Sequence, residues 1–184
     1  WDNYMEKVSK EYEANDILMN FVDNHDENSW NGTINSRLGE AREAMVALSY
    51  LTPGIPLIYS GDEYGLDHSL KFFEKDSIPK TKGKEWDLLA KLGELKNNNS
   101  ALAGGKQKAS YKKISTSDDN SVLVFEREKE GKKVVFVANL TKDEQNVTFE
   151  LDQKYTDYNT GKPFEFQKEE GLKLQPWQYY ILVN

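Results

Sequence analysis

Residues 17–26 read Ile-Leu-Met-Asn-Phe-Val-Asp-Asn-His-Asp, a short and mostly apolar run that ends in polar residues. A brief apolar run of this kind is typical of a strand that is buried on both faces. The polar, Asn-rich stretch from Asn24 to Ser36 then predicts a loop. We therefore expect a buried strand whose C-terminal end presents a carboxylate and an imidazole to a polar loop.

The same order of elements follows again along the chain. Apolar residues recur at helical spacing over 37–51 and predict a helix, capped by Ser36 and ended by Thr52-Pro53-Gly54. Residues 56–59 predict a second buried strand, and after a loop with two glycines residues 85–96 predict a second helix. This repeated order of strand, loop and helix is typical of a parallel βα architecture, in which sites form at the C-terminal ends of the strands.

The second half of the sequence follows a different pattern. Strand-like runs at 122–125 and 134–137 flank Glu130-Gly131-Lys132, which predicts a hairpin turn. Apolar and polar residues alternate over 146–151 and again over 177–183, as in half-buried strands. This pattern predicts a small antiparallel β-sandwich.

Composition excludes several classes of partner. The formal net charge is −7, and the lysines stand beside acidic residues, so we expect no nucleic acid partner. No apolar run approaches the roughly 20 residues of a membrane span, so we expect no membrane partner. There is no cysteine, and His68 stands alone in a polar loop, so we expect no metal site.

The adjacent His25 and Asp26 allow two interpretations. Planar polar groups at the mouth of a βα unit bind sugar hydroxyls through charge-assisted hydrogen bonds, and a carboxylate there can stabilise an oxocarbenium-like transition state. The same dipeptide could instead cap the following turn, with Asp26 accepting from backbone N–H groups. The dipeptide alone leaves both interpretations open.

Two longer motifs carry a family resemblance. The hexapeptide 21–26 resembles the strand-7 motif Phe-x-x-Asn-His-Asp of the α-amylase family of glycoside hydrolases. The segment from Gly54 to Gly65 resembles the family's strand-8 segment, Gly-x-Pro-x-Ile-Tyr-x-Gly-[Asp/Gln]-Glu. Residues 26–32 and 72–76 are similar to amylases of starch-using Bacteroidetes-type bacteria.

The resemblance implies a fold in two parts. Residues 1–103 would be the C-terminal portion of a (β/α)8 TIM barrel, containing strands 7 and 8 with their helices. Residues 104–184 would be the family's domain C, an antiparallel β-sandwich. The resemblance thus covers nearly the whole chain and implies α-glucan, starch or maltooligosaccharide, as the substrate.

The resemblance also implies roles for particular residues. Asp26 matches the catalytic carboxylate that stabilises the transition state, and His25 matches the histidine that binds the same sugar. Asn24 precedes them and is expected at the substrate-binding loop, chiefly to position it. Trp30 could stack on a glucose ring or pack on its own domain. Glu63 is expected to support the site from behind without touching the sugar.

The two other catalytic carboxylates of the family have no match in this sequence. The family's nucleophile lies in a Gly-x-Arg-x-Asp pattern, but none of Arg37, Arg42 and Arg127 has an Asp two places later. A retaining glycosidase needs both a nucleophile and an acid/base, so we expect this chain to be inactive by itself and to be a fragment of an active enzyme. The family's calcium ligands lie mostly outside the matched region, so we expect no cofactor in this chain and leave calcium open for the complete enzyme.

Other functions remain as alternatives. The chain could act as a non-catalytic carbohydrate-binding or interaction module, or resemble inactive amylase-like ectodomains of transporters, although the intact Asn24-His25-Asp26 argues against the latter. Two parallel strands without neighbours also predict self-association of the chain through its N-terminal half. The compartment stays open, with a secreted or periplasmic location favoured.

Overall fold

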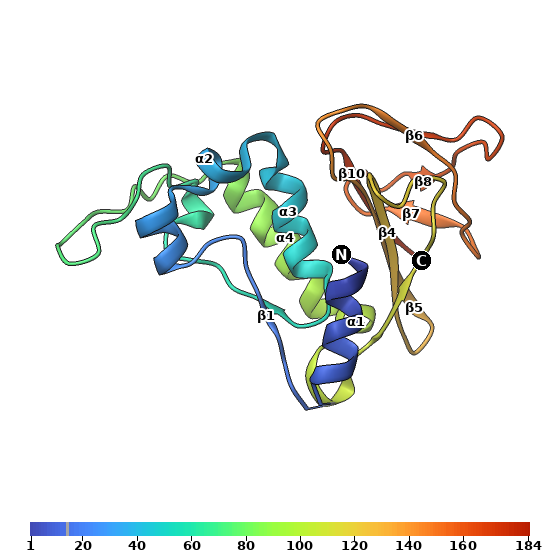
Figure 1. Ribbon diagram of the computed structural model, residues 1–184, viewed down its shortest axis with the longest axis horizontal. Coiled ribbons are helices and arrows are strands. Elements are labelled where there is room, and N and C mark those ends of the chain that lie inside the picture. Colours follow the sequence, from blue (N-terminus) through green and yellow to red (C-terminus); the bar gives the residue numbers. More distant parts are fainter. Residues whose placement is uncertain (14) are drawn as a thin grey trace.

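The computed structural model describes residues 1–13 and 15–184 and contains a helical half and a β-sheet half (Figure 1). The helices are α1 (Asp2–Glu11), α2 (Ile34–Leu38), α3 (Arg42–Leu51) and α4 (Lys84–Asn98). Shorter helical turns are η1 (Glu27–Asn31), η2 (Gly39–Ala41), η3 (Asp62–Tyr64), η4 (Ser100–Leu102) and η5 (Gly105–Gln107). The strands are β1 (Met19–Asn20), β2 (Ile55–Pro56), β3 (Ser110–Lys113), β4 (Val122–Lys129), β5 (Lys132–Asn139), β6 (Gln145–Val147), β7 (Tyr155–Asp157), β8 (Pro163–Phe164), β9 (Leu172–Leu174) and β10 (Tyr179–Val183).

The strands β1 and β2 pair in parallel, as predicted, with Met19 opposite Ile55. Both are shorter than the expected strands at 17–22 and 56–59, because each has only the other as a neighbour within the described residues. Gly54 allows the two segments to approach closely: its φ is +123°, and a Cβ there would lie 2.3 Å from the carbonyl oxygen of Leu18. Among the described residues, the outer edges of this short pair have no strand partner.

The helix expected over 37–51 begins earlier and is interrupted. Thr33, rather than Ser36, is the cap of α2, because its hydroxyl oxygen accepts from the backbone N–H of Ser36. Gly39, with φ of +52°, ends α2, and the turn η2 leads into α3. The helix α3 ends at Thr52, close to the predicted stop, and α4 extends the predicted 85–96 by a few residues.

The antiparallel sheet is the larger element of the second half. Within the part of the chain that the structure describes, it has the strand order β3-β4-β5-β10-β7-β8, and β6 pairs separately with β9. The predicted hairpin turn joins β4 to β5: Lys129 pairs with Lys132, and Glu130 and Gly131 both have positive φ, as in a type I′ turn. The expected antiparallel sandwich is confirmed, although the strand predicted over 146–151 is only β6.

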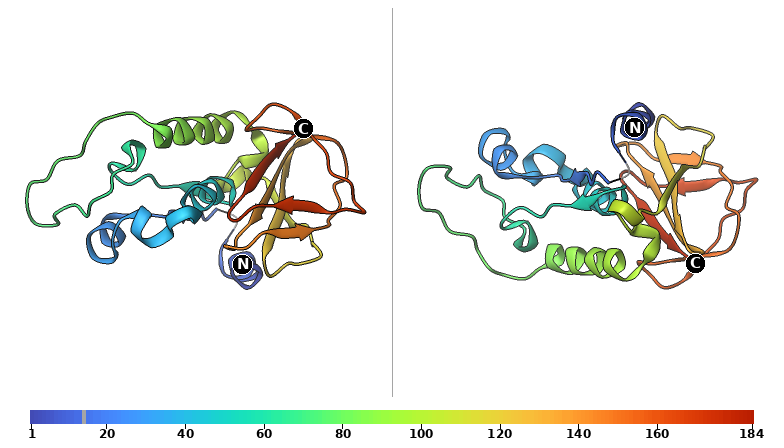
Figure 2. Two further views of the ribbon diagram at one scale, coloured as in Figure 1. Left: turned by 90° about the horizontal axis from the view of Figure 1, so that it is seen from above. Right: turned by 90° about the horizontal axis from the view of Figure 1, so that it is seen from below.

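The sheet is covered on both faces, and Figure 2 shows the helices α3 and α4 beside it. Phe125, Phe136 and Ile181 belong to one core with residues of α3, α4 and η4, such as Leu51 and Leu102. Alternate residues on the same strands, such as Val124 and Leu182, belong to a second core under β6 and β9. The strand β10 is therefore buried on both sides, unlike the half-buried strand predicted over 177–183. One hydrophobic core thus crosses the boundary expected near residue 104.

Helix α1 has no counterpart among the sequence-based predictions. It buries none of its residues, although its apolar residues Tyr4, Met5 and Val8 recur at helical spacing. It lies against the sheet through Trp1, whose Nε1 donates to the hydroxyl of Tyr111 at 2.8 Å, and through an ion pair of Asp2 with Lys113 at 2.5 Å. Polar contacts at its N-terminal end therefore fix α1.

Two cations, the buried Arg127 and the half-buried Lys96, hold the C-terminal end of α3. The guanidinium of the fully buried Arg127 donates to the carbonyl oxygens of Leu51, Ser110 and Ala103 at 2.9, 2.8 and 3.2 Å. The ammonium of Lys96 donates to the carbonyl oxygen of Tyr50 at 3.1 Å. Burial, reinforced by the nearby guanidinium, lowers the pKa of Lys96 to about 8. Positive charge at a helix C-terminus complements the helix dipole and satisfies its unpaired carbonyl groups.

We expect Arg127→Met to lower the free energy of unfolding by about 3–5 kcal/mol, because it leaves buried carbonyl groups without donors. Urea denaturation of the 184-residue chain measures this loss. Lys129→Met is the matched control: it removes a cation from the same strand that donates to the carbonyl oxygen of Gln107 at the surface, and we expect a loss below about 1 kcal/mol. Equal losses in the two variants would show that the buried guanidinium has no special role.

Candidate functional site

The loop after β1 is closed by a buried ion pair. Asp23 is buried, and its Oδ1 lies 2.7 Å from Nη2 of Arg37. Arg37 also donates to the carbonyl oxygens of Val22 and Gly32, one at each end of the loop. Burial raises the pKa of Asp23, and the guanidinium of Arg37 opposes that shift in part. This pair, which the sequence analysis did not assign, fixes the loop that carries His25 and Asp26.

Asn24 shapes the same loop from within. Its side-chain oxygen accepts from the backbone N–H of Glu27 at 2.8 Å, and its carbonyl oxygen accepts from the N–H of Asn28 at 2.9 Å. Asn24 therefore performs the local capping that the sequence allowed for Asp26. Asn24 thus helps to shape the loop through both its side chain and its backbone.

His25 and Asp26 project from this loop into solvent. Their side chains are each 64% exposed, and His25 Nε2 lies 3.5 Å from Asp26 Oδ2. Asp26 precedes η1 but makes no side-chain capping hydrogen bond to it. The alternative in which Asp26 caps the turn is therefore wrong. The pair leaves its hydrogen-bonding capacity available to a ligand while buried neighbours hold the backbone.

The loop after β2 is joined to the first loop by side-chain hydrogen bonds. The buried Asn28 accepts from the backbone N–H of Leu70 at 2.7 Å, and the hydroxyl of Thr33 donates to Asp67 at 2.8 Å. These bonds link the loops at the C-terminal ends of the two parallel strands. They bring the ring of Phe72 to 6.1 Å from that of His25, a neighbour that the sequence analysis missed.

Glu63 and Trp30 occupy different surroundings. The carboxylate of Glu63 accepts from the backbone N–H of Gly61 at 3.0 Å, so it supports the turn at η3. Among the described residues, Glu63 forms no hydrogen bond or ion pair with His25 or Asp26. Trp30 is 63% exposed, and its ring lies 5.4 Å from that of Phe72. Trp30 thus contacts its own chain through Phe72 and keeps most of its surface in solvent.

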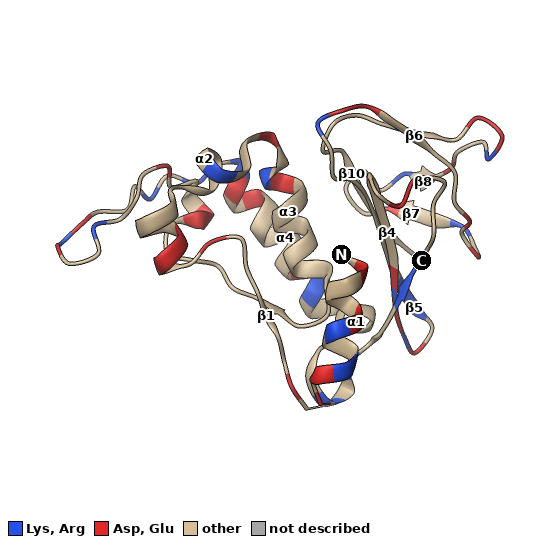
Figure 3. Ribbon diagram, in the orientation of Figure 1, with Lys and Arg blue, Asp and Glu red and all other residues tan. Residues whose placement is uncertain are grey.

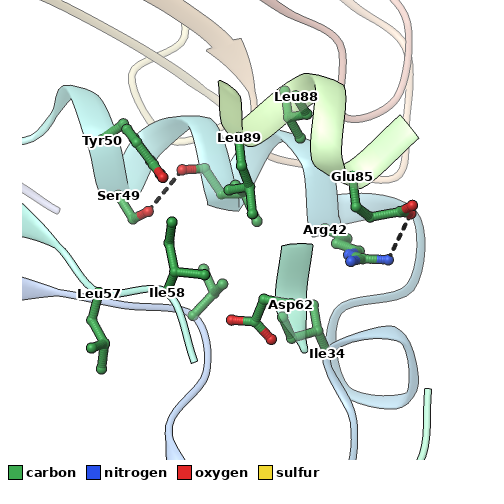
Figure 4. Close-up of a pocket in the computed structure, with 12 residues that line it drawn as sticks. Ile34, Arg42, Ser49, Tyr50, Leu57, Ile58, Asp62, Glu85, Leu88 and Leu89 are labelled. Atoms are coloured by element: carbon green, nitrogen blue, oxygen red, sulfur yellow. Dashed lines mark hydrogen bonds and ion pairs between the residues drawn. The ribbon is translucent and has the colours of Figure 1, made fainter. Parts of the chain in front are cut away.

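A buried carboxylate lies behind the second loop. Asp62 faces a cavity of about 20 Å³ that is also lined by residues of α3 and α4, including Tyr50 and Leu89 (Figure 4). That volume holds about one water molecule. Asp62 Oδ2 accepts from the backbone N–H of Tyr59 at 2.9 Å, and burial raises the pKa of Asp62 to about 7. The sequence signal for it was its place beside Glu63 in the strand-8 motif.

The distribution of charged residues, of metal-ligating side chains and of apolar helices concerns three kinds of partner: nucleic acids, metal ions and membranes. Lys and Arg are interspersed with Asp and Glu along the helices and the sheet (Figure 3). Among residues 1–13 and 15–184, no three His, Cys, Asp or Glu side chains gather closely enough to hold a metal ion. In the same residues, no helix has the length and apolar character to cross a membrane.

Comparison with known proteins relates both halves to amylases. Residues 113–181 match the family described as maltogenic amylase, C-terminal domain. The whole chain aligns with a noncanonic maltogenic α-amylase from Thermotoga neapolitana, with a TM-score of 0.81, 17% identity and 45% of that protein covered. A search of curated protein sequences found no match.

Two further solved structures extend the likeness. The α-amylase GTA from Geobacillus thermoleovorans, complexed with acarbose, aligns over 99% of this chain and 42% of its own length, with a TM-score of 0.71 and 18% identity. The gamma-CGTase of alkalophilic Bacillus clarkii aligns over all of this chain and 28% of its own, with a TM-score of 0.72 and 19% identity. The chain thus spans less than half the length of each of these proteins. The resemblance to the α-amylase family of glycoside hydrolases is confirmed, and the similarity of the second half is to the C-terminal domain of a maltogenic amylase.

We expect the contribution of Asp62 to the stability of the chain to fall by up to about 4 kcal/mol as the pH rises from about 4 to about 7. The folded-state pKa of Asp62 lies above the unfolded value of 3.8, so between the two values the folded chain binds more protons. Asp62→Asn stays neutral and can still accept from Tyr59. The variant should therefore lose this part of the pH slope and gain stability at pH 7.5 relative to the original chain.

Urea denaturation at several pH values between 4 and 7.5 measures this difference. Glu74→Gln is the control, because Glu74 is an exposed carboxylate in the same loop, and the pH slope of that variant should match that of the original chain. Parallel curves for Asp62→Asn and the original chain would contradict the assigned ionisation of Asp62.

Proposed function

We propose that this chain is part of an α-glucan-active retaining glycoside hydrolase of the α-amylase type. The observation that carries this proposal is the exposed pair of His25 and Asp26, held at the end of β1 by the buried Asp23 and Arg37. An imidazole and a carboxylate held by a rigid backbone are preorganised for hydrogen bonding to one sugar residue. The proposal assigns them to starch or a maltooligosaccharide.

The proposed role of Asp26 is electrostatic. Cleavage of a glycosidic bond passes through an oxocarbenium-like state, in which positive charge develops at the anomeric carbon and the ring oxygen. An ionised carboxylate beside the ring, hydrogen-bonded to sugar hydroxyl groups, favours that charge more than it favours the neutral substrate. His25 hydrogen-bonds the same sugar and helps to orient it.

The proposed context for this pair is a (β/α)8 barrel, in which β1 and β2 would be strands 7 and 8. The parallel register of β1 and β2, the packing of α3 against β2 and the packing of α4 against α3 support this assignment. Active sites of such barrels lie at the C-terminal ends of the strands. Asp26 follows β1, and Glu63 follows β2, so both lie at that end.

The proposed enzyme takes its nucleophile and its acid/base from outside this chain. A retaining mechanism needs two carboxyl groups about 5–5.5 Å apart on either side of the scissile bond. The motif that would carry the nucleophile does not occur in the sequence. We therefore propose that the 184-residue chain hydrolyses no glycoside by itself. In the complete enzyme, the acceptor of the glycosyl group can be water or another sugar.

In the complete enzyme, we expect Asp26→Asn to lower kcat/KM on a soluble maltooligosaccharide by about 10²–10³, because it removes one transition-state contact while keeping the shape of the side chain. A reducing-sugar assay measures the change. The 184-residue chain alone should give no turnover in the same assay.

The matched control is Glu74→Gln. Glu74 is an exposed carboxylate of the second loop that pairs with Lys71 at 3.0 Å, and its loss should change kcat/KM by less than about threefold. If folded Asp26→Asn also loses less than about threefold, the proposed role of Asp26 is wrong.

We also propose that the 184-residue chain self-associates through β1 and β2. Met19 and Ile58 are exposed, and the outer edges of the two strands are unpaired among the described residues. Exposed edges and apolar surface favour association with another chain. Met19→Lys with Ile58→Lys should shift sedimentation velocity profiles at micromolar concentration toward the 21.2 kDa monomer.

Tyr12→Lys is the control for this experiment, because Tyr12 is an exposed aromatic residue just after α1. That variant should sediment like the original chain. A strictly monomeric original chain across the micromolar range would contradict the proposed self-association.

A further inference from the structure

The turn η1 ends in the dipeptide Asn31-Gly32, which is the one Asn-Gly pair in the sequence. Asn31 is exposed, and its side-chain Nδ2 donates to Oε2 of Glu27 at 3.1 Å on the surface of the loop. This is the loop that carries His25 and Asp26. The side-chain amide of Asn31 is therefore accessible to water, close in the chain to the exposed pair.

The geometry of the loop requires glycine at position 32. The φ of Gly32 is +100°, in the region that favours glycine, and a Cβ there would lie 2.6 Å from Oγ of Ser36. That hydroxyl is held in place because it donates to the carbonyl oxygen of Thr33 at 2.9 Å. The carbonyl oxygen of Gly32 in turn accepts from Nε of Arg37 at 3.0 Å. The fold thus requires a backbone nitrogen without a neighbouring side chain directly after Asn31.

An asparagine followed by glycine can react with its own backbone. The backbone nitrogen of Gly32 attacks Cγ of Asn31, so that a new C–N bond closes a five-membered succinimide ring. The bond from Cγ to the side-chain nitrogen breaks, and this nitrogen leaves as ammonia with the proton that the backbone nitrogen has lost. Water then opens the ring at either of its carbonyl groups, which gives aspartate or isoaspartate. Nothing is oxidised or reduced, and water is the only co-reactant.

We propose that Asn31 is a site of spontaneous modification by water, at which the side-chain amide is converted to aspartate or isoaspartate. The exposure of Asn31 and the glycine that the loop geometry requires after it carry this inference. It does not depend on the proposed function, because the reaction needs no sugar and no other part of an enzyme.

The modification would weaken the support of the loop. It places a carboxylate where the amide of Asn31 donated to Glu27, and like charges four residues apart in a helical turn repel each other. Oε2 of Glu27 also lies 3.5 Å from Nη1 of Arg37, so the new carboxylate competes for the guanidinium that holds Asp23. Isoaspartate also adds a methylene group to the main chain, directly before the carbonyl of Gly32 that Arg37 binds.

The test incubates the 184-residue chain at mildly alkaline and at mildly acidic pH and maps its peptides by mass spectrometry. We expect the peptide that contains Asn31 to gain about one dalton and to contain isoaspartate. The gain should be faster at alkaline pH, because the attacking nitrogen has to lose its proton. Asn159 is the internal control: it is exposed but followed by Thr160, whose branched side chain hinders the attack, so it should stay intact.

Asn31→Gln is the matched variant, because it keeps the amide but would have to close a six-membered ring, which forms far more slowly. This variant should keep its mass under the same conditions. An intact Asn31 in the folded chain, modification of Asn159 at the same rate, or an equal mass gain in Asn31→Gln would each overturn the assignment.

Thermal unfolding measures the effect on the loop. The modified chain carries an additional negative charge and can be separated by anion exchange. Its Tm should lie about 1–2 °C below that of the unmodified chain, and Asn31→Asp should show a similar decrease. Equal Tm values for the modified and unmodified chains would contradict the proposed weakening of the loop.

Discussion

The C-terminal carbonyl groups of α3 are held by two cations that come from distant parts of the chain. Arg127 reaches them from β4 and Lys96 from α4, and both are substantially removed from water. A guanidinium that donates to several backbone carbonyls at once fixes the segments to which they belong. The end of α3 determines where Thr52-Pro53-Gly54 turns, and this turn places β2 beside β1. The positions of the loops after β1 and β2 thus depend on the charges of Arg127 and Lys96 at the C-terminal end of α3.

Rigidity and exposure are divided between different residues in the loops. Asp23, Asn28 and Arg37 satisfy the backbone from within, and their own polar groups are engaged there. His25 and Asp26 contribute little to that support and keep their polar atoms in solvent. Because these neighbouring side chains hold the backbone of the loop, His25 and Asp26 can keep their polar atoms free for a ligand. The loop stays ordered although these two side chains do not support it.

The sequence predicted much of this arrangement because its strongest signals are local. Apolar runs, the stop at Thr52-Pro53-Gly54 and the turn at Glu130-Gly131 depend on neighbours in the chain, and they correspond to α3, β2 and the hairpin of β4 and β5. The lengths of β1 and β2 were overestimated because strand length depends on partners on both sides, which a local pattern does not report.

The parts of the site that the sequence analysis missed are long-range. Nothing in the spacing of Asp23 and Arg37 required their ion pair, and only the folded loops bring Phe72 beside His25. The helix α1 was missed although Tyr4, Met5 and Val8 recur at helical spacing, a local signal that the sequence analysis did not use. His25 and Asp26 were proposed from the sequence because their motif is contiguous.

The six-stranded sheet separates two hydrophobic cores and contributes side chains to both of them. Modular exchange of the β-sheet half between related proteins is therefore constrained. A graft made at residue 104 would place the sheet face of another protein against α3, α4 and η4. It would also remove the hydrogen bond that Arg127 donates to the carbonyl oxygen of Leu51. Homologous recombination within this lineage should preserve α3 and β4 as a co-adapted pair, even where the loops between them diverge.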